Sequence, residues 1–208
     1  MPAADLELLY SDASLLVVNK PAGLLAVPGR GADKQDCLSA RIQQEFADAL
    51  VVHRLDMATS GLMVFARGTG MQSDLSRLFR ERLVEKRYIA CIAGQISPAT
   101  GEIALPLGAD WPNRPRQKVD ADTGKPSLTR YRLLDYDDDS DISRIELEPV
   151  TGRTHQLRVH MMAAGHAIVG DRLYGGREAS RLMLHARSLS FAHPVGGEPL
   201  ALASEPPF

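Results

Sequence analysis

The sequence predicts an α+β fold in which one domain is built on a mixed, mainly antiparallel sheet flanked by helices and loops. Short apolar segments typical of strands outnumber the segments with helical spacing. Successive strand-like segments are often joined by turns too short for the helical crossovers that parallel strands require. The chain has 208 residues, 44% of them hydrophobic and 24% charged, and this length can bury a core without disulfides.

In the first part of the chain, apolar runs predict short strands at 14–18, 62–66 and 87–93. Two segments with helical spacing alternate with them, at 36–50 and 71–83. Apolar residues recur every four positions in the first, and Asp36 is placed to cap its N-terminus. The second is amphipathic, with apolar side chains on one side and Arg77, Arg80 and Arg82 on the other.

The second part of the chain predicts strands at 102–107, 128–134, 142–150 and 183–191. The segment 142–150 alternates apolar and polar residues, which is typical of a half-buried strand. One helix is expected at 154–164, ended by Gly165. A long, basic, proline-containing connection joins the first two of these strands. The acidic run at 135–141 is expected to be a solvated loop.

Composition excludes several classes of protein and leaves the partner open. No apolar window approaches the length of a membrane span, and no signal peptide is visible, so we expect a cytoplasmic protein without a membrane partner. The net charge of −2 neither indicates nor excludes nucleic acid, because binding follows local patches. Cys37 and Cys91 lack the spacing of a disulfide framework or a zinc site. Phosphate-loop, dinucleotide-binding and metalloprotease motifs are also missing, so we expect no metal and no cofactor.

The segment HRLDMATSG at 53–61 is a polar insert between two apolar runs. Asp56 lies in it with Arg54, small residues and a glycine, a setting that suits a cleft. The residues alone are equally compatible with an aspartate that caps a turn and pairs with an arginine.

A second informative segment runs from Pro149 to His160. A strand ends there, Gly152 turns the chain, and a helix is expected to start at Thr154 with three basic or titratable residues beside it: Arg153, His155 and Arg158. The N-terminus of a helix with such neighbours suits an anion such as an RNA phosphate or a carboxylate. A capped helix with solvated basic residues is the alternative, although Arg158 lies in an otherwise apolar stretch.

With these two segments the chain resembles the RluA-type pseudouridine synthases. The resemblance runs from about residue 15 to residue 194 and rests on motifs that occur in the family's order: VNKPAG at 18–23, HRLD at 53–56 with TSG at 59–61, KRY at 86–88, GRTHQLRVH at 152–160, GHAIVGD at 165–171 with LYG at 173–175, and LMLHA at 182–186. Residues 57–58, DWPNRP at 110–115 and TGKP at 123–126 are similar to the branch that acts on both 23S rRNA and tRNA stem-loops.

The resemblance implies a cofactor-free isomerase that converts uridine in RNA to pseudouridine. It makes Asp56 the catalytic carboxylate, Arg158 the cation beside it and Tyr88 the tyrosine that contacts the base. Leu184 matches an apolar residue of the pocket wall, although plain core packing would explain it almost as well. A carboxylate can attack or stabilise an oxocarbenium-like C1′, or remove a sugar proton, and the sequence leaves these routes open.

The target uridine must leave its stack to react, and Arg54 is the candidate to fill the gap. We expect further RNA contacts from basic residues in three places: Arg114, Arg116, Lys118 and Lys125 in the long connection, Arg153 and His155 before the last helix, and Arg80 on the amphipathic helix with Arg77 and Arg82. Taken singly, most of them would also suit a solvated face.

We expect residues 1–208 to form a single catalytic domain without an S4 RNA-binding domain, and to act as a monomer. Three alternatives stay open at this stage. The chain could be a sibling synthase with another rRNA or tRNA target, a catalytically silent RNA-binding protein on the same fold, or an N-glycosidase that cleaves without rejoining the bond.

Overall fold

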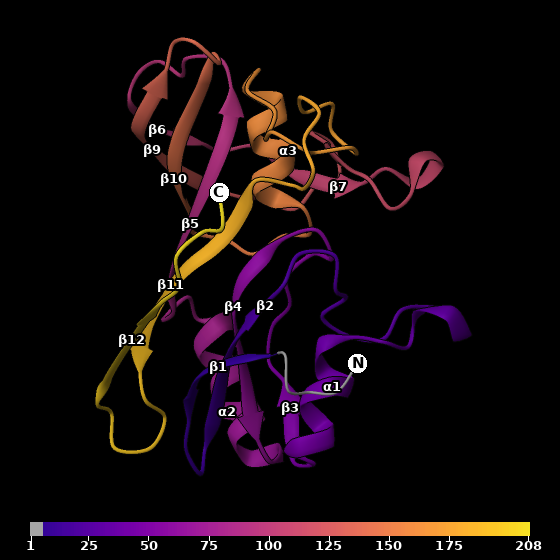
Figure 1. Cartoon of the computed structure of the whole chain (residues 1–208), viewed down its shortest axis with the longest axis vertical. Helices are drawn as coiled ribbons and strands as arrows, with labels where there is room; N and C mark the ends of the chain where they lie inside the picture. Colours follow the sequence, from indigo (N-terminus) through magenta and orange to yellow (C-terminus); the bar gives the residue numbers. More distant parts are fainter. Residues whose placement is uncertain (1–5) are drawn as a thin grey trace. The chain divides into compact units, whose positions relative to one another are not determined.

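The structure is a computed structural model, and it describes residues 6–208 of the chain. These residues form two compact units (Figure 1). The first holds the described residues up to Lys86 together with Ala186–Pro207, and the second holds Arg87–His185 and Phe208. The chain therefore leaves the first unit once and returns to it for its last strands.

The first unit is built on strands in the order β1-β2-β4-β11, in which β2 pairs antiparallel with both β1 and β4. β3 also pairs with β4, and β12 pairs with β11. The strands are β1 (Glu7–Ser11), β2 (Leu15–Lys20), β3 (Ala49–Val51), β4 (Ser60–Arg67), β11 (Leu184–Ala192) and β12 (Pro199–Ala203). The first two residues of β11 belong to the second unit. Lys20 is the last residue of β2, and Ser60 is the first residue of β4. The sheet therefore fixes where the loop after β2 begins and where the loop before β4 ends.

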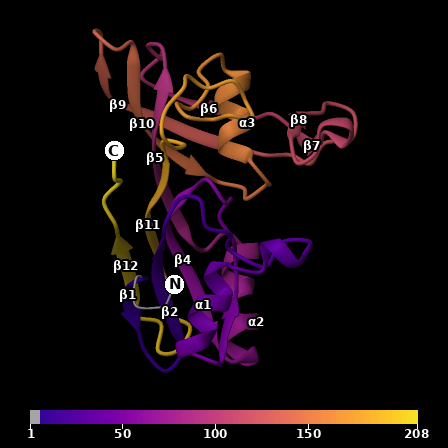
Figure 2. The ribbon, with the colours of Figure 1, turned by 45° about the vertical axis from the view of Figure 1, so that its right-hand side comes forward.

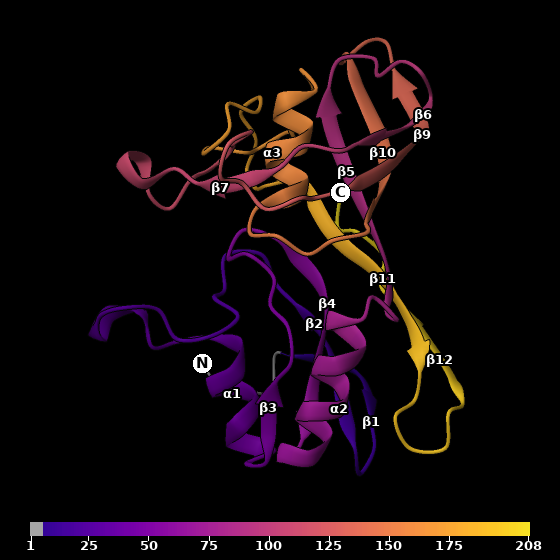
Figure 3. The same ribbon diagram turned by 180° about the vertical axis from the view of Figure 1, so that it is seen from behind.

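Two helices accompany this sheet, α1 (Leu38–Glu45) and α2 (Thr69–Arg80), and Figure 3 shows α2 alongside β4. The core under α2 contains Leu15 and Val17 of β2, Leu62 and Val64 of β4, and Leu75 of α2. Because side chains alternate along a strand, this set marks one face of the sheet. The intervening residues of both strands are buried too, which explains why these strands read as continuous apolar runs.

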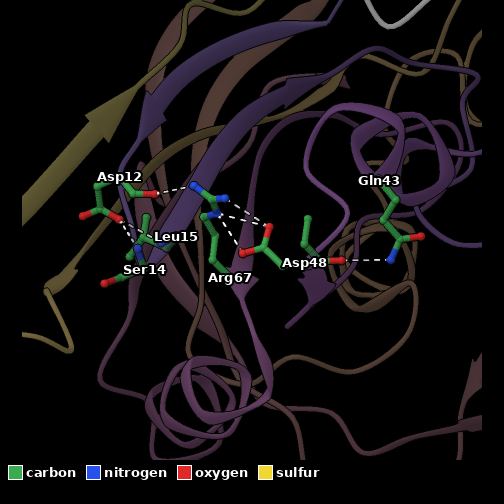
Figure 4. A network of polar contacts seen from close by, with 7 residues as sticks. Asp12, Ser14, Leu15, Gln43, Asp48 and Arg67 are labelled. Carbon is green, nitrogen blue, oxygen red and sulfur yellow. Dashed lines mark hydrogen bonds and ion pairs between the residues drawn. The ribbon is translucent and has the colours of Figure 1, made fainter.

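A polar network fixes the ends of three strands of this unit (Figure 4). The Arg67 guanidinium binds the Asp48 carboxylate and donates to the carbonyl of Asp12. The Asp12 carboxylate in turn accepts the backbone N–H groups of Ser14 and Leu15. These contacts hold together the start of β2, the start of β3 and the end of β4.

The second unit has antiparallel strands in the order β5-β10-β9-β6 and a separate hairpin of β7 and β8. Its elements are β5 (Glu85–Ala93), β6 (Thr100–Ile103), β7 (Leu107–Ala109), β8 (Gln117–Val119), β9 (Thr129–Asp137), β10 (Ile142–Pro149) and α3 (Gln156–Ala163). Figure 2 shows the β7–β8 hairpin standing away from the strands of its own unit. Short 3-10 turns lie at Ala32–Lys34 and Trp111–Asn113.

The predicted fold class is confirmed, because the named strands pair antiparallel and helices accompany them. The strand expected at 142–150 is β10, in which exposed and buried residues alternate as predicted. Gly165 follows α3 with φ of 86°, as expected for a residue that ends a helix.

Several predicted boundaries are wrong. The first helix ends at Glu45, and Leu50 lies in β3 rather than in the helix. Its N-cap is Cys37, whose sulfur accepts the N–H of Ala40, whereas Asp36 forms an ion pair with Arg41. The segment 102–107 is divided between β6 and the start of β7. The acidic run is only partly a loop, because β9 continues to Asp137.

Candidate active site and nucleic-acid interface

Asp56 lies in a tight turn that leads from the loop after β3 into β4. Its carbonyl accepts the N–H of Thr59, which closes the turn over residues 56–59. Leu55, directly before it, is buried, whereas Arg54 and Met57 are exposed and Asp56 is half-buried. The turn therefore anchors itself through Leu55 and presents Arg54 and Asp56 as neighbours on one short segment.

A buried lysine ties this turn to the loop after β2. Lys20, the last residue of β2, has no exposed surface. Its ammonium group donates to the carbonyls of Pro21 at 2.9 Å, Leu24 at 2.8 Å and Met57 at 3.1 Å. Gly23 adds a backbone bond to the same Met57 carbonyl. A buried ammonium needs such acceptors, so the bonds that satisfy Lys20 also fix the residue after Asp56.

His53 is held as a neutral ring at the start of the same segment. Its Nε2 accepts the backbone N–H of Val64, and its ring stacks on Phe79 with 4.3 Å between the centroids. Burial and the charge of Lys86 lower the pKa of His53 to about 3. His53 therefore connects this segment to β4 through its hydrogen bond with Val64 and to α2 through its stacking on Phe79.

Gly61 is the last residue of the segment HRLDMATSG, and the structure requires a glycine at this position. It has a φ of 115°, and a Cβ built there would lie 2.3 Å from the carbonyl oxygen of Ala186 on β11. Only glycine allows β4 to approach β11 this closely at the point where the turn of Asp56 joins the sheet.

In the second unit, Arg158 of α3 forms a buried ion pair with Asp171. Nε and one terminal nitrogen of the guanidinium donate to the two carboxylate oxygens at 2.7 and 2.8 Å. The arginine side chain is 6% exposed and the aspartate side chain 0%. Asp171 also accepts the backbone N–H groups of Leu173 and Tyr174. This bidentate geometry fixes the plane of the guanidinium.

The resemblance pairs Arg158 with Asp56, and the sequence gives no sign of the contact with Asp171. The motif GHAIVGD contains Asp171, but nothing in its spacing from Arg158 indicates a contact. The pairing of Arg158 with Asp56 joins residues of different units and stays a prediction.

Tyr174 connects this ion pair to the base of the β7–β8 hairpin. Its ring lies under the Arg158 guanidinium, 5.1 Å from the guanidinium carbon to the ring centroid. Its hydroxyl oxygen lies 2.7 Å from Nδ1 of His155 and accepts the N–H of Gln117 at 2.8 Å. His155 adopts a left-handed conformation with φ of 54°, which turns the chain into α3. His155 is therefore part of this hydrogen-bonded network, through its contact with Tyr174, rather than a solvated residue.

Gln156 ties the start of α3 to the sheet of its unit. Its side-chain oxygen accepts from Thr151 Oγ1 and from the N–H of Arg153. Its side-chain nitrogen donates to the Leu128 carbonyl and lies 3.0 Å from Thr129 Oγ1. His160, one helical turn further, is fully buried between Thr129 and Ser127, and burial lowers its pKa. Gln156 and His160 of the motif GRTHQLRVH are thus buried polar anchors of the helix that carries Arg158.

Tyr88 and Leu184 also belong to the second unit. Tyr88 lies on β5 opposite Leu147 of β10 and is half-buried. Leu184 is the first residue of β11 and is 3% exposed. Such burial suits both a pocket wall and plain packing, so the role of Leu184 stays a prediction.

Three of the basic residues predicted to bind RNA line one open groove of about 720 Å³. Lys118 comes from β8, Lys125 from the turn after it, and Arg153 from the turn before α3. Asp120 also lines the groove, lies 3.9 Å from Lys118, and is held by the backbone N–H groups of Asp122 and Thr123. These contacts lower the pKa of Asp120, so the groove carries three cations against one carboxylate.

The other predicted RNA-binding residues are placed differently. Arg114 lies over the ring of Trp111, 4.0 Å from the guanidinium carbon to the ring centroid. Arg116 lies over Tyr174, and its Nε is buried without a hydrogen-bond partner among the described residues. Arg80 and Arg77 lie in the last turn of α2, where Arg77 is close to Asp74 and Glu81.

Residues 6–208 contain no group of three or more His, Cys, Asp or Glu side chains arranged to hold a metal ion. No helix among them is both long and apolar enough to span a membrane.

Comparison with known proteins identifies relatives along the whole chain. Residues 14–163 match the family described as RNA pseudouridylate synthase. The chain is 48% identical over 207 residues to the "Dual-specificity RNA pseudouridine synthase RluA" of Escherichia coli K12, covering 98% of this chain and 94% of that protein. It is 49% identical over 204 residues to the protein of the same name from Yersinia pestis, covering 96% and 98%.

A solved structure agrees with these matches. "Human RNA Pseudouridylate Synthase Domain Containing 1" superposes with a TM-score of 0.82 at 32% identity and covers 100% of this chain and 86% of its own. The family match spans more than half of the chain and includes Asp56, Tyr88 and Arg158. The chain therefore belongs to the RNA pseudouridylate synthase family, the isomerases that convert uridine in RNA to pseudouridine.

Proposed function

We propose that the chain isomerises uridines in two kinds of RNA, a 23S rRNA hairpin and the anticodon loop of tRNA. The observation that carries this proposal is the similarity to dual-specificity synthases, which extends over 98% of the chain. The motifs at 110–115 and 123–126, which resemble that branch, lie on the β7–β8 hairpin and beside the basic groove. The motifs that support the choice of RNA thus lie close to the basic groove that is proposed to bind it.

Asp56 is the proposed catalytic carboxylate. Pseudouridine formation breaks the bond from C1′ to N1, turns the freed uracil and forms a bond from C1′ to C5. Nothing is oxidised and no group is imported, so the reaction balances without a cofactor. A carboxylate on a rigid turn can stabilise the electron-poor C1′ or bond to it. The anchoring of the adjacent Met57 by Lys20 supports this role, because a catalytic group must be held in position.

Arg158 and Tyr88 complete the proposed catalytic set. Arg158 would hold the Asp56 carboxylate ionised, and the pair with Asp171 would fix the orientation in which it does so. Tyr88 would stack on the uracil, and its phenol could help to remove the C5 proton. Leu184 would form part of the apolar wall.

Arg54 is the proposed residue that fills the gap left by the flipped uridine, and its exposure beside Asp56 supports this role. Lys118, Lys125 and Arg153 would bind phosphates from the groove that they share. Arg80, Arg116 and His155 would add contacts at the edges of the bound RNA.

We propose that both compact units form a single catalytic domain of 208 residues. The family match supports this, because it runs through parts of both units. We further propose that the protein acts as a monomer in the cytoplasm, where bacterial rRNA and tRNA are found.

The experiment incubates the protein with unmodified 23S rRNA and unmodified tRNA and maps pseudouridine by its carbodiimide adducts. The proposal requires a new pseudouridine in both RNAs, with EDTA present in a parallel reaction to test for a metal requirement. Modification of only one RNA class would show a sibling synthase of single specificity. Abasic sites without pseudouridine would show an N-glycosidase, and unmodified RNA that is nevertheless bound would show a catalytically silent protein.

A further inference from the structure

Trp111 is the only tryptophan of the chain, and 67% of it is exposed. Tryptophan carries the largest apolar surface of any side chain, and exposing it to water has an energetic cost that burial would avoid. An exposed tryptophan in a solvated loop therefore calls for an occupant that covers it.

The loop around Trp111 is held in one conformation. Backbone hydrogen bonds cross it, since the N–H of Asp110 donates to the Arg116 carbonyl and the N–H of Arg116 to the Asn113 carbonyl. Asn113 also donates to both the carbonyl and the carboxylate of Asp110. The hairpin below is anchored by the Tyr174 hydroxyl through the N–H of Gln117. The ring is thus presented on a fixed support rather than on a flexible tip.

One face of the indole is covered by Arg114. The guanidinium carbon lies 4.0 Å from the ring centroid, a distance typical of a stacked cation–π pair. This position makes Arg114 a partner of Trp111 rather than an independent phosphate contact. A ring with one face covered and most of its surface still exposed has its remaining face open for a planar ligand.

The surroundings of the open surface select that ligand. Trp111 lines the same groove as Lys118, Lys125 and Arg153, so a flat aromatic surface and a cationic wall meet at one place. A nucleobase with its attached phosphates combines a π-face with negative charge, which matches both parts of this surface. Base stacking tolerates any base, because each base has a π-face.

We propose that Trp111, backed by Arg114, is a stacking platform for an unpaired RNA base whose flanking phosphates lie in the groove of Lys118, Lys125 and Arg153. The base that this platform would stack is a different one from the uridine that is proposed to react at Asp56. This inference deepens the proposed function and rests on it for the identity of the RNA. It assigns recognition of RNA loops to a residue that carries no charge.

The test uses the full chain and an unmodified tRNA anticodon stem-loop transcript. Because the chain has one tryptophan, its emission reports on position 111 alone. Binding is followed in parallel by the anisotropy of labelled RNA. The proposal requires that the indole emission is quenched over the same RNA concentrations as the anisotropy rises. Unchanged emission on fully bound protein would overturn it.

Variants separate stacking from charge. Trp111→Ala should weaken binding about 5- to 100-fold, as expected for the loss of one base–aromatic stack, and leave the slope of log K against log salt unchanged. Trp111→Phe keeps an aromatic face and should restore binding to within about threefold of the wild type. Lys118→Ala should instead reduce the salt slope by roughly 0.7–0.9. Val195→Ala, which truncates a side chain that is 60% exposed outside the hairpin, is the matched control and should change neither quantity.

Equal affinity of Trp111→Ala and the wild type would refute the platform, as would a lower salt slope in Trp111→Ala, since that would assign the loss to a phosphate contact. Failure of the proposed function is distinguishable from either result. Absence of pseudouridine in all reactions would remove the proposed reaction, whereas the quenching and affinity data would still decide whether Trp111 stacks on RNA.

Discussion

Breaking the ion pair between Arg158 and Asp171 should destabilise the protein strongly. Both side chains are almost completely buried, and two charge-assisted hydrogen bonds of 2.7 and 2.8 Å join them. Arg158→Leu leaves the buried Asp171 carboxylate without the guanidinium, and Asp171→Asn removes the carboxylate that binds the guanidinium through two hydrogen bonds. Either loss costs about 3–5 kcal/mol in proteins. For a chain of this length that corresponds to a decrease in the melting temperature of about 6–20 °C.

The double variant Arg158→Leu/Asp171→Asn tests whether the cost comes from the unpaired charge. It removes both charges, so its destabilisation should be smaller than the sum of the single values by at least about 2 kcal/mol. Arg54→Ala is the matched control, because Arg54 is exposed, and it should change stability by no more than about 0.5 kcal/mol. Thermal unfolding followed by circular dichroism measures all four proteins.

Additive effects of the two substitutions, or a loss below about 1 kcal/mol in either single variant, would refute the reasoning. A stable Arg158→Leu together with an unstable Arg54→Ala would show that the two arginines have exchanged roles. Turnover adds a second readout. If Asp171 is a positioning residue for Arg158, Asp171→Asn should lower the rate of pseudouridine formation at saturating RNA and change its pH profile, while RNA affinity stays within a few-fold of the wild type.

Three further predictions concern other parts of the molecule. First, the pKa of His53 is lowered to about 3 in the folded protein from 6.5. The unfolded chain therefore binds the proton first, and stability should decrease as the pH falls from about 6.5 towards 3, by at most about 1.4 kcal/mol per pH unit. His53→Gln, which can still accept the N–H of Val64, should flatten this dependence in urea titrations between pH 7.5 and pH 4.5, and an unchanged slope would assign it to other groups. Second, Gly61→Ala should prevent normal folding, because its Cβ would lie 2.3 Å from the Ala186 carbonyl oxygen, whereas Gly152→Ala, with no atom within 4 Å, should be nearly neutral in the same melting assay. Third, Lys125→Ala and Arg153→Ala should each reduce the salt slope of RNA binding by roughly 0.7–0.9, because both residues line the groove. Arg77→Ala should reduce the slope less, because Arg77 lies next to Asp74 and Glu81. Slopes equal to that of the wild type for both groove variants would show that the groove is only solvated surface.

Strong periodic patterns predicted the central elements of the fold. β10 alternates along its length, and α2 keeps its apolar side chains on one side, so both were found with small errors at their ends. The first helix was extended too far because Leu50 continues the spacing of Leu38 and Ile42, although it lies in β3. The edge strands β1 and β12 were missed, because alternation is hidden in a segment such as Pro199–Ala203, where all residues are apolar.

The candidate site was predictable where a motif carries it and not where the fold creates it. The turn of Asp56 and the buried environment of Arg158 followed from local sequence. The partnership of Arg158 with Asp171 and the contacts of Lys20 with Met57 did not, because they join residues 13 and 37 positions apart. The basic residues of the long connection could be named from the sequence. Their positions could not be predicted, because the sequence patterns did not reveal the β7–β8 hairpin. The hairpin places Lys118 and Lys125 in the groove, Arg114 on Trp111 and Arg116 on Tyr174.

The central claim is that Asp56 carries the isomerisation. Forming the bond from C1′ to C5 releases the hydrogen of C5, so RNA labelled with tritium at C5 of uridine reports the complete reaction. With enzyme in excess over a tRNA transcript, the wild type should release tritium in proportion to the pseudouridine formed. Asp56→Asn, which is nearly isosteric but carries no charge, should bind the same RNA with similar affinity and release none. Release by Asp56→Asn at a rate within tenfold of the wild type would exclude Asp56 as the catalytic group.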